Sequence, residues 1–231
     1  MILGLMQPYI FPYLGYYQLV NSVDCFVFYD DVTYIKGGYI NRNLIKVNNK
    51  KQRFTVPLTG ASSNVLICDV LCSDKLRKLL TTIEQAYCKA PYFNDIYPLI
   101  KETLLSEDRR LSVVAAKSIE LVFKYLEIEK ELYFSSDLAY DRTLSATDKI
   151  IDICKIMNCN KYVNSYGGIN LYDQSYFKDN SICLNFIRKN EMHSYQNSTD
   201  SEFIDNLSMI DILMWNSKEQ VCEMLLNYEL I

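Results

Sequence analysis

Two adjacent carboxylates close the second apolar run of the chain, and they are the first residues that could do chemistry. Asp30 and Asp31 follow Cys25–Tyr29, and Gln7 follows an earlier apolar run, Ile2–Met6. Because the carboxyl ends of parallel strands meet at one edge of a sheet, these polar residues are expected to face the same edge. Carboxylates placed there can act as a general base, bind sugar hydroxyls or hold a cation. We therefore predict Asp30 and Asp31 as catalytic residues and Gln7 as a substrate-binding residue.

A turn rich in proline and aromatic residues, spanning 7–16, joins the first apolar run to a short helix. A strand that ends in such a turn exposes backbone N–H groups at the helix N-terminus, where anions bind. Gly15 has no side chain, so a ligand or the backbone can come close to it. Tyr13, Gly15 and Tyr16 are therefore predicted to contact the substrate. The alternative is a rigid aromatic turn that packs under the sheet.

The next segment combines fixed cations with amides, and its candidate substrate-binding residues are Tyr34, Lys36, Asn41, Arg42 and Asn43. Arginine presents a planar fork to carboxylate or phosphate, and lysine presents a point charge. Beside the acids that precede it, this segment predicts recognition of a phosphorylated, hydroxyl-rich ligand. An ordinary solvated loop is the alternative.

The second half of the chain adds two further groups. Asn164, Gly167 and Gly168 follow a predicted strand and precede a helix, although they form neither a dinucleotide-binding nor a P-loop motif. His193 and Gln196 follow the last apolar run, and His193 is the only histidine, the residue type that titrates near neutral pH. We predict His193 as a third catalytic candidate and the others as substrate-binding. The alternative for His193 is a histidine that faces solvent.

The elements that must position these residues follow an alternating order. Short apolar runs predict strands at 2–6, 25–29, 131–135, 161–165 and 182–187. The order strand-helix-strand, helical insertion, strand-helix-strand-helix-strand predicts an α/β fold with a mainly parallel, Rossmann-like sheet. We expect a single α/β domain over residues 1–231, with the helical insertion at about 73–128.

Other segments are assigned from periodicity and capping residues. Residues 32–49 form a polar stretch, and strands are predicted at 52–58 and 65–71. Helices are predicted at 73–88 with Ser73 as N-cap, 91–105 with a kink or break at Pro98, 111–126, 145–157, 207–215 with Ser208 as N-cap, and 218–228.

Composition narrows the class of protein. The 231 residues are 49% hydrophobic and 23% charged, which is typical of a globular chain. The net charge of −4 disfavours a strongly basic nucleic-acid surface, although it allows a local basic patch. No apolar run approaches the ~20 residues of a membrane span. No signal peptide is visible after Met1, so a cytoplasmic protein is expected.

The eight cysteines form no CxxC pair, and no histidine lies near the closest pairs. Free cysteines of this kind are typically buried thiols of a reducing compartment. We therefore expect no metal site.

Several blocks of the chain resemble the WbqC-like family, and the resemblance runs almost end to end. They are QPYIFPYLGYYQLVNSVDCFVFYDDVTYIKGGYINRN, NSYGGINLYDQSYF, SYQN and LSMIDILMWN. Such proteins are typical of bacterial surface-polysaccharide gene clusters, especially those that make modified amino sugars. The resemblance implies a role in making or decorating an O-antigen or a similar glycan, as in lipopolysaccharide biosynthesis.

The first block also has the layout of the HUP fold of nucleotidyltransferases and class I synthetases. In that fold a strand runs into a turn, an HxGH motif opens a helix, and a second strand follows. Here the sequence Tyr13-Leu14-Gly15-Tyr16 stands in the place of HxGH, so both histidines are tyrosines. Because adenylyl transfer of that kind needs the histidines to neutralise nucleotide phosphates, the resemblance implies the sheet and its pocket but not the standard reaction.

The leading hypothesis is a transferase that adds an acyl or aminoacyl group to the amine of a nucleotide-linked amino sugar. Asp30 or Asp31 would deprotonate or orient the attacking amine, while Lys36 and Arg42 would hold phosphate or carboxylate. Gln7 and the nearby asparagines would bind sugar hydroxyls or the acyl carbonyl.

The donor and the class of protein stay open. An acyl thioester such as acyl-CoA and an aminoacyl-tRNA both fit the chemistry, and the acidic pI of about 5.2 counts against tRNA. One alternative is a non-catalytic sugar-nucleotide-binding protein of the glycan pathway. Another is an ATP-using ligase or nucleotidyltransferase with a degenerate HxGH motif.

Overall fold

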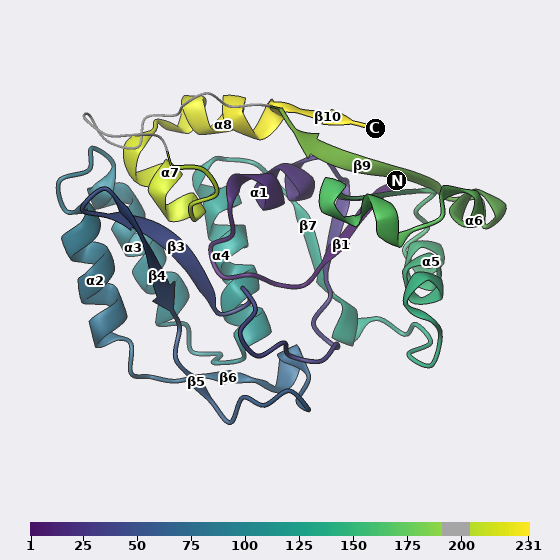
Figure 1. Ribbon diagram of the computed structural model, residues 1–231, viewed down its shortest axis with the longest axis horizontal. Helices are drawn as coiled ribbons and strands as arrows, with labels where there is room; N and C mark the ends of the chain where they lie inside the picture. The colour runs from purple at the N-terminus through teal and green to yellow at the C-terminus, as the bar shows by residue number, and fades with distance from the viewer. Residues whose placement is uncertain (191–203) are drawn as a thin grey trace.

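The central sheet is mixed but mainly parallel. In the computed structural model, which describes residues 1–190 and 204–231, the sheet has six strands in the order β10-β9-β8-β1-β2-β7 (Figure 1). Five parallel strands are β1 (Ile2–Met6), β2 (Cys25–Phe28), β7 (Glu131–Phe134), β8 (Lys161–Ser165) and β9 (Cys183–Lys189). β10 (Tyr228–Leu230) is antiparallel to β9. The predicted α/β class with a mainly parallel sheet is therefore confirmed.

Helices cover both faces of this sheet. The helices of the described residues are α1 (Leu14–Asn21), α2 (Arg77–Tyr87), α3 (Phe93–Leu104), α4 (Leu111–Tyr125), α5 (Ala146–Ile156), α6 (Gln174–Asp179), α7 (Met209–Trp215) and α8 (Lys218–Leu226). Three short 3₁₀ helices are η1 (Ile67–Asp69), η2 (Ser135–Asp137) and η3 (Tyr166–Leu171). Among the described helices, none is both long enough and apolar enough to cross a membrane.

Alternating side chains of the strands divide the core into two apolar clusters. Phe26 and Phe28 of β2 point into a large cluster shared with α1 to α4, α7 and α8, whereas Cys25 and Val27 point into a smaller one shared with α5 and α6. This arrangement explains why the strands of a parallel sheet are apolar on both faces. The predicted stripe of α4 is buried in the larger cluster.

A β-hairpin begins within the stretch 32–49, which was expected to be polar. β3 (Arg42–Val47) pairs with β4 (Lys50–Thr55), with Val47 opposite Lys50. Asn48 and Asn49 connect them with φ angles of 49° and 59°. Two residues with positive φ give the tight turn that matches strand twist, and asparagine tolerates this conformation. β3 was not predicted within the polar stretch 32–49, because Asn-Asn was not recognised as a turn signal.

Of the two other strands predicted in this region, one is confirmed with shifted bounds and one is wrong. The expected strand at 52–58 ends at Thr55, because Pro57 lacks an N–H and cannot continue the ladder; β5 (Leu58–Thr59) follows. The expected strand at 65–71 is instead η1 followed by β6 (Leu71–Cys72), which pairs with β5.

Helix ends differ from the predictions where local hydrogen bonds compete. α2 begins at Arg77, and the Ser73 hydroxyl accepts from the N–H of Lys75 instead of capping the helix. α3 continues through Pro98 as one helix. α8 ends at Leu226, so the last residues form β10 instead of the predicted helical turn. Ser208 caps α7, as predicted.

Close packing between β1 and β2 predicts the effect of one substitution. A Cβ added at Gly4 would lie 2.9 Å from the ring of Phe26, which is fully buried. We expect Gly4→Ala to lower the free energy of unfolding by about 1–3 kcal/mol, because the core cannot make room without strain. Urea unfolding followed by circular dichroism measures the change.

Gly167→Ala is the matched control, because an added Cβ there has no atom within 4 Å. Its unfolding midpoint should match that of the wild type. Equal midpoints for the Gly4 and Gly167 variants would contradict the close packing described here.

Candidate functional site

The order in which the chain adds strands to the sheet reverses between β1 and β8. From β1 the chain moves through β2 to β7 on one side, and then crosses to β8 and β9 on the other. In open α/β sheets, ligands bind outside the carboxyl ends of the strands at such a switch point. Gln7 follows the last residue of β1, and Asn164 is the second-last residue of β8. These two predicted site residues therefore lie at the ends of neighbouring strands.

The loop that leaves β1 is held in a strained conformation. Phe11 has a φ of 39°, which is unusual for a bulky residue. Its N–H donates to the Ser118 hydroxyl at 2.9 Å, and its carbonyl accepts from the Asn43 amide at 2.7 Å and from the Ser208 hydroxyl at 2.6 Å. Strain of this kind persists only where the surroundings hold it, and it is frequent at functional sites.

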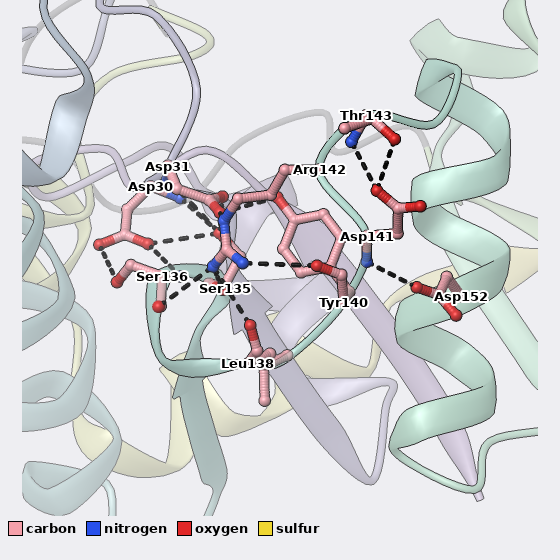
Figure 2. Close-up of polar contacts among 10 residues, drawn as sticks. All are labelled: Asp30, Asp31, Ser135, Ser136, Leu138, Tyr140, Asp141, Arg142, Thr143 and Asp152. Atoms are coloured by element: carbon pink, nitrogen blue, oxygen red, sulfur yellow. Dashed lines mark hydrogen bonds and ion pairs between the residues drawn. The ribbon is translucent and has the colours of Figure 1, made fainter.

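Asp30 and Asp31 lie at the neighbouring strand end, beside β7 (Figure 2). Ser136 donates to Asp30 twice, from its N–H at 3.0 Å and from its hydroxyl at 3.1 Å. The buried hydroxyl of Ser135 contacts both carboxylates and accepts the N–H of Asp30 at 3.0 Å. We call these four residues, with Tyr140 and Arg142, the acid network.

Arg142 fixes the loop that carries these serines. Its Nε donates to Asp31 at 2.7 Å, and the Tyr140 hydroxyl donates to the same carboxylate oxygen at 2.8 Å. One terminal nitrogen of Arg142 donates to the carbonyl oxygens of Ser135, Ser136 and Leu138, each at 3.2 Å. The guanidinium therefore uses most of its donors within the protein and stabilises the loop from 135 to 142 (Figure 2).

Within the acid network, the fold raises the pKa of Asp30. Burial raises its pKa, the two hydrogen bonds from Ser136 oppose this rise, and the neighbouring charge of Asp31 adds to it. Asp30 is only 1% exposed, whereas Ser136 is exposed. A ligand at this edge would therefore reach Asp30 through the Ser136 hydroxyl.

A group of tyrosines connects the acid network with the end of β8. Burial raises the pKa of Tyr29, a hydrogen bond with Tyr140 opposes that rise, and the nearby Asp31 and Tyr172 add to it. Asn164 in turn donates to the hydroxyl of Tyr172 at 3.2 Å. The two parts of the edge thus form one polar surface.

Several residues predicted to bind substrate are engaged in the framework. Tyr16 is buried, and its hydroxyl donates to the carbonyl of Gln7 at 2.9 Å. The Tyr34 hydroxyl donates to Asn41, and the Asn41 amide donates to the carbonyl of Val56. These side chains, like that of Asn43, hold loops together in this structure instead of facing solvent.

The glycines also have framework roles. A Cβ at Gly15 would lie 2.8 Å from the ring of Tyr13, so the absence of a side chain lets that ring pack there. Gly168 is buried, and a Cβ there would lie 3.4 Å from the ring of Tyr172. Gly167 is exposed beside it.

Arg42 and Lys36 differ from these residues. The Nε of Arg42 is buried without a hydrogen-bond partner, and within the described residues its side chain forms no ion pair. Lys36 is exposed beside the turn at Gly37. Both remain available to an anion. His193 and Gln196 lie outside the described residues.

Sequence reasoning missed Ser135, Ser136, Tyr140 and Arg142. They follow a strand that was predicted correctly, so their position at a strand end was a usable signal. What the sequence could not supply is that β7 lies beside β2, because more than 100 residues separate the two partners of each contact.

The described cavities lie elsewhere. One of about 850 Å³ opens at the amino end of β7, next to Asp24, Lys130 and Glu131, and another of about 430 Å³ lies beside the start of β9. In the portion of the chain that the structure covers, no three His, Cys, Asp or Glu side chains are grouped to hold a metal ion.

Removing the guanidinium from the acid network should destabilise the fold. Arg142→Ala is expected to lower the free energy of unfolding by about 2 kcal/mol, because Asp31 is left buried without its cation and three carbonyls lose a donor. Chemical denaturation measures this loss. The matched control is Arg188→Ala, whose ion pair with Glu229 is exposed and should contribute little. Equal losses in the two variants would contradict the assigned role of Arg142.

The raised pKa of Asp30 predicts a pH dependence of stability. A carboxyl whose pKa is higher in the folded than in the unfolded state favours folding when protonated. Its contribution is present below the unfolded pKa of about 3.9 and is lost as pH rises through the folded pKa. The difference in unfolding free energy between wild type and Asp30→Asn should therefore fall over that pH window and then level off. A difference that rises with pH there would contradict the assignment.

Comparisons with known proteins agree with the blocks seen in the sequence. The sequence pattern of the WbqC-like protein family matches residues 7–223. The uncharacterized protein Rv1507c of Mycobacterium tuberculosis (strain ATCC 25618 / H37Rv) is 25% identical over 214 residues, covering 91% of each chain. No solved structure matches the chain significantly. Because the family pattern covers nearly the whole length, the chain belongs to the WbqC-like protein family.

Proposed function

We propose that this protein is a cytoplasmic transferase of surface-polysaccharide biosynthesis of the O-antigen type. It would add an acyl or aminoacyl group to the amine of a nucleotide-linked amino sugar. The observation that carries the proposal is the pairing of the buried Asp30 carboxyl with the exposed Ser136 hydroxyl at the carboxyl edge of the sheet. This geometry supports proton transfer at a place where α/β sheets bind ligands.

Proton removal is the step that these residues would perform. An amino-sugar amine is a nucleophile only after its ammonium form loses a proton. The Ser136 hydroxyl would accept that proton while passing its own to Asp30, whose raised pKa favours acceptance. The free amine would then attack the acyl carbonyl and form a carbon–nitrogen bond. The proton that this nitrogen loses would pass to the leaving sulfur or ribose oxygen as the carbon–sulfur or carbon–oxygen bond breaks.

The remaining predicted residues would bind and orient the substrates. Arg42, whose guanidinium has no anionic partner within the described residues, would hold a phosphate or carboxylate, with Lys36 at the rim. Gln7 at the switch point would bind a sugar hydroxyl or the acyl carbonyl. Asp31 would act indirectly, because its pairing with Arg142 positions the loop that carries Ser136.

The fold assignment behind this proposal is a Rossmann-like sheet of HUP type within a single domain spanning 1–231. Support comes from the switch point between β1 and β8 and from α2 to α4, the segment of the insertion at about 73–128, which share a core with α1. Buried Tyr16, which stands in place of a histidine of HxGH, donates its hydroxyl to the carbonyl of Gln7 and so does not direct it at a phosphate. This observation disfavours the ATP-using ligase or nucleotidyltransferase.

A non-catalytic sugar-nucleotide-binding protein is the second candidate. The amides of Asn41, Asn43 and Asn164 are already bonded within the protein, which favours a rigid surface over a reactive one. Binding without turnover would distinguish this candidate from the transferase.

The experiment begins with a thermal-shift screen of the purified protein against sugar nucleotides, acyl-CoAs and ATP. Acceptors that bind are then incubated with acyl-CoA or aminoacyl-tRNA, and N-acylated product is measured by mass spectrometry. We expect turnover to fall at least about 100-fold in Ser136→Ala and Asp30→Asn, in line with loss of general base catalysis. Arg42→Ala should weaken binding of the acceptor or donor.

The controls Ser22→Ala and Asp24→Asn change the same residue types at the opposite edge of the sheet. The Ser22 hydroxyl donates to a carbonyl, and Asp24 accepts from the N–H of Ile2 at 2.8 Å. Both variants should keep wild-type turnover. Unchanged turnover in Ser136→Ala and Asp30→Asn would overturn the proposed site, and tight binding without product from any donor would favour the non-catalytic candidate.

A further inference from the structure

Positive charge is concentrated in one part of this acidic chain. Residues 46–89 contain eight Lys or Arg and three Asp or Glu, a net charge of +5, whereas the rest of the chain holds 16 basic and 25 acidic residues, a net charge of −9. The basic segment includes the end of β3, all of β4 and α2. These elements lie together on the side of the molecule away from α5 and α6 (Figure 1).

A groove of about 380 Å³ runs between β4 and α2 within this segment. Its lining includes Arg53, Lys75 and Lys78, and no carboxylate. All three cations are exposed, and none forms an ion pair with a described residue. Like charges gathered in a groove raise the local positive potential, which attracts an anion.

We infer that this groove binds the phosphate backbone of a nucleic acid. Lysine and arginine contact phosphate oxygens, and the hydroxyl and amide side chains of Gln52, Thr55 and Thr82 in the same lining can donate to them as well. Further exposed cations extend the surface beyond the groove, at Lys50 and Lys51 on β4. This row of cations, in the groove and on β4, suits a chain of phosphates better than a single phosphate.

The surface lacks what an anionic membrane would require. Proteins that lie on a membrane place apolar side chains next to their cations. The aromatic and leucine side chains that line the groove, Phe54 and Leu79, are buried, and the exposed Leu66 and Leu71 of the basic segment are not among its lining residues. The groove is therefore assigned to a nucleic acid and not to a lipid surface.

The groove adjoins Arg42, one of the predicted substrate-binding residues, through one strand pair. Thr55 of the groove lies opposite Arg42 of β3, and side chains of directly opposed residues lie on the same face of a hairpin. If the proposed function holds, on which this step rests, the nucleic acid is the tRNA of an aminoacyl donor. The acidic pI, which counted against a tRNA donor, reflects the rest of the chain.

The test measures binding of the full-length protein to fluorescently labelled bulk tRNA by anisotropy at several salt concentrations. We expect binding at about 50 mM salt that weakens about 20–40-fold at 200 mM, as release of counterions from about three phosphates requires. The variant Arg53→Glu/Lys75→Glu/Lys78→Glu should lower the affinity at least about tenfold and flatten the salt dependence. A triple variant with the same charge change, Lys155→Glu/Lys161→Glu/Lys178→Glu, should change the affinity less than about threefold.

Binding measurements with other ligands identify the class of molecule that the groove recognises. Duplex DNA that binds as well as tRNA supports recognition of the backbone alone, and stronger binding of tRNA supports an RNA ligand at the same groove. The inference is overturned if the wild type binds neither at 50 mM salt, if the two triple variants lose affinity equally, or if only vesicles of phosphatidylglycerol are bound. Because no acceptor or acyl group is present, failure here leaves the transferase proposal intact with an acyl thioester donor.

Discussion

The way the chain leaves its central strand is the constraint on which the carboxyl edge of the sheet depends. Phe11 adopts a left-handed conformation that its bulk disfavours, and it stays there because Ser118, Asn43 and Ser208 bond both of its backbone polar groups. These partners come from α4, β3 and the cap of α7. One strained residue therefore links the sheet, the hairpin and the C-terminal helices, and it fixes the path of the loop from Gln7 to Tyr13.

The acid network imposes a similar constraint one strand away. Two adjacent carboxylates at the end of β2 are buried, and a buried charge is tolerated only with hydrogen-bond donors around it. Nearly all of those donors come from the loop at 135–142. The network thus joins the ends of the paired strands β2 and β7. It leaves Ser136 exposed, with its hydroxyl donating to Asp30. Stability and the proposed chemistry depend on the same contacts.

Much of the fold could be predicted because its signals are local. The apolar stripe of α4, the strand at 161–165 and the cap at Ser208 each depend on neighbouring residues, and each was placed correctly. The hairpin was missed because its turn signal is Asn48-Asn49 instead of a glycine pair. β10 was missed because residues 228–230 are extended through their pairing with β9, which is distant in sequence.

The candidate site was predicted only in part, for a physical reason. Strand ends mark where polar side chains gather, so Gln7 and Asp30 were placed at one edge. The same rule cannot tell a residue that faces a ligand from one that holds the framework, and in this structure the amides of Asn41 and Asn43 donate to backbone carbonyls. Burial and hydrogen-bond partners decide between the two, and they depend on contacts distant in sequence.

The most direct test of the central claim, that the carboxyl edge of the sheet is the ligand site, is hydrogen–deuterium exchange with and without nucleotide-linked amino sugars. The amides of residues 7–13, 29–31, 135–142 and 164–168 should exchange more slowly when a sugar nucleotide is bound. Protection confined to the cavity at the amino end of β7, or no protection of these segments by any sugar nucleotide, would contradict it.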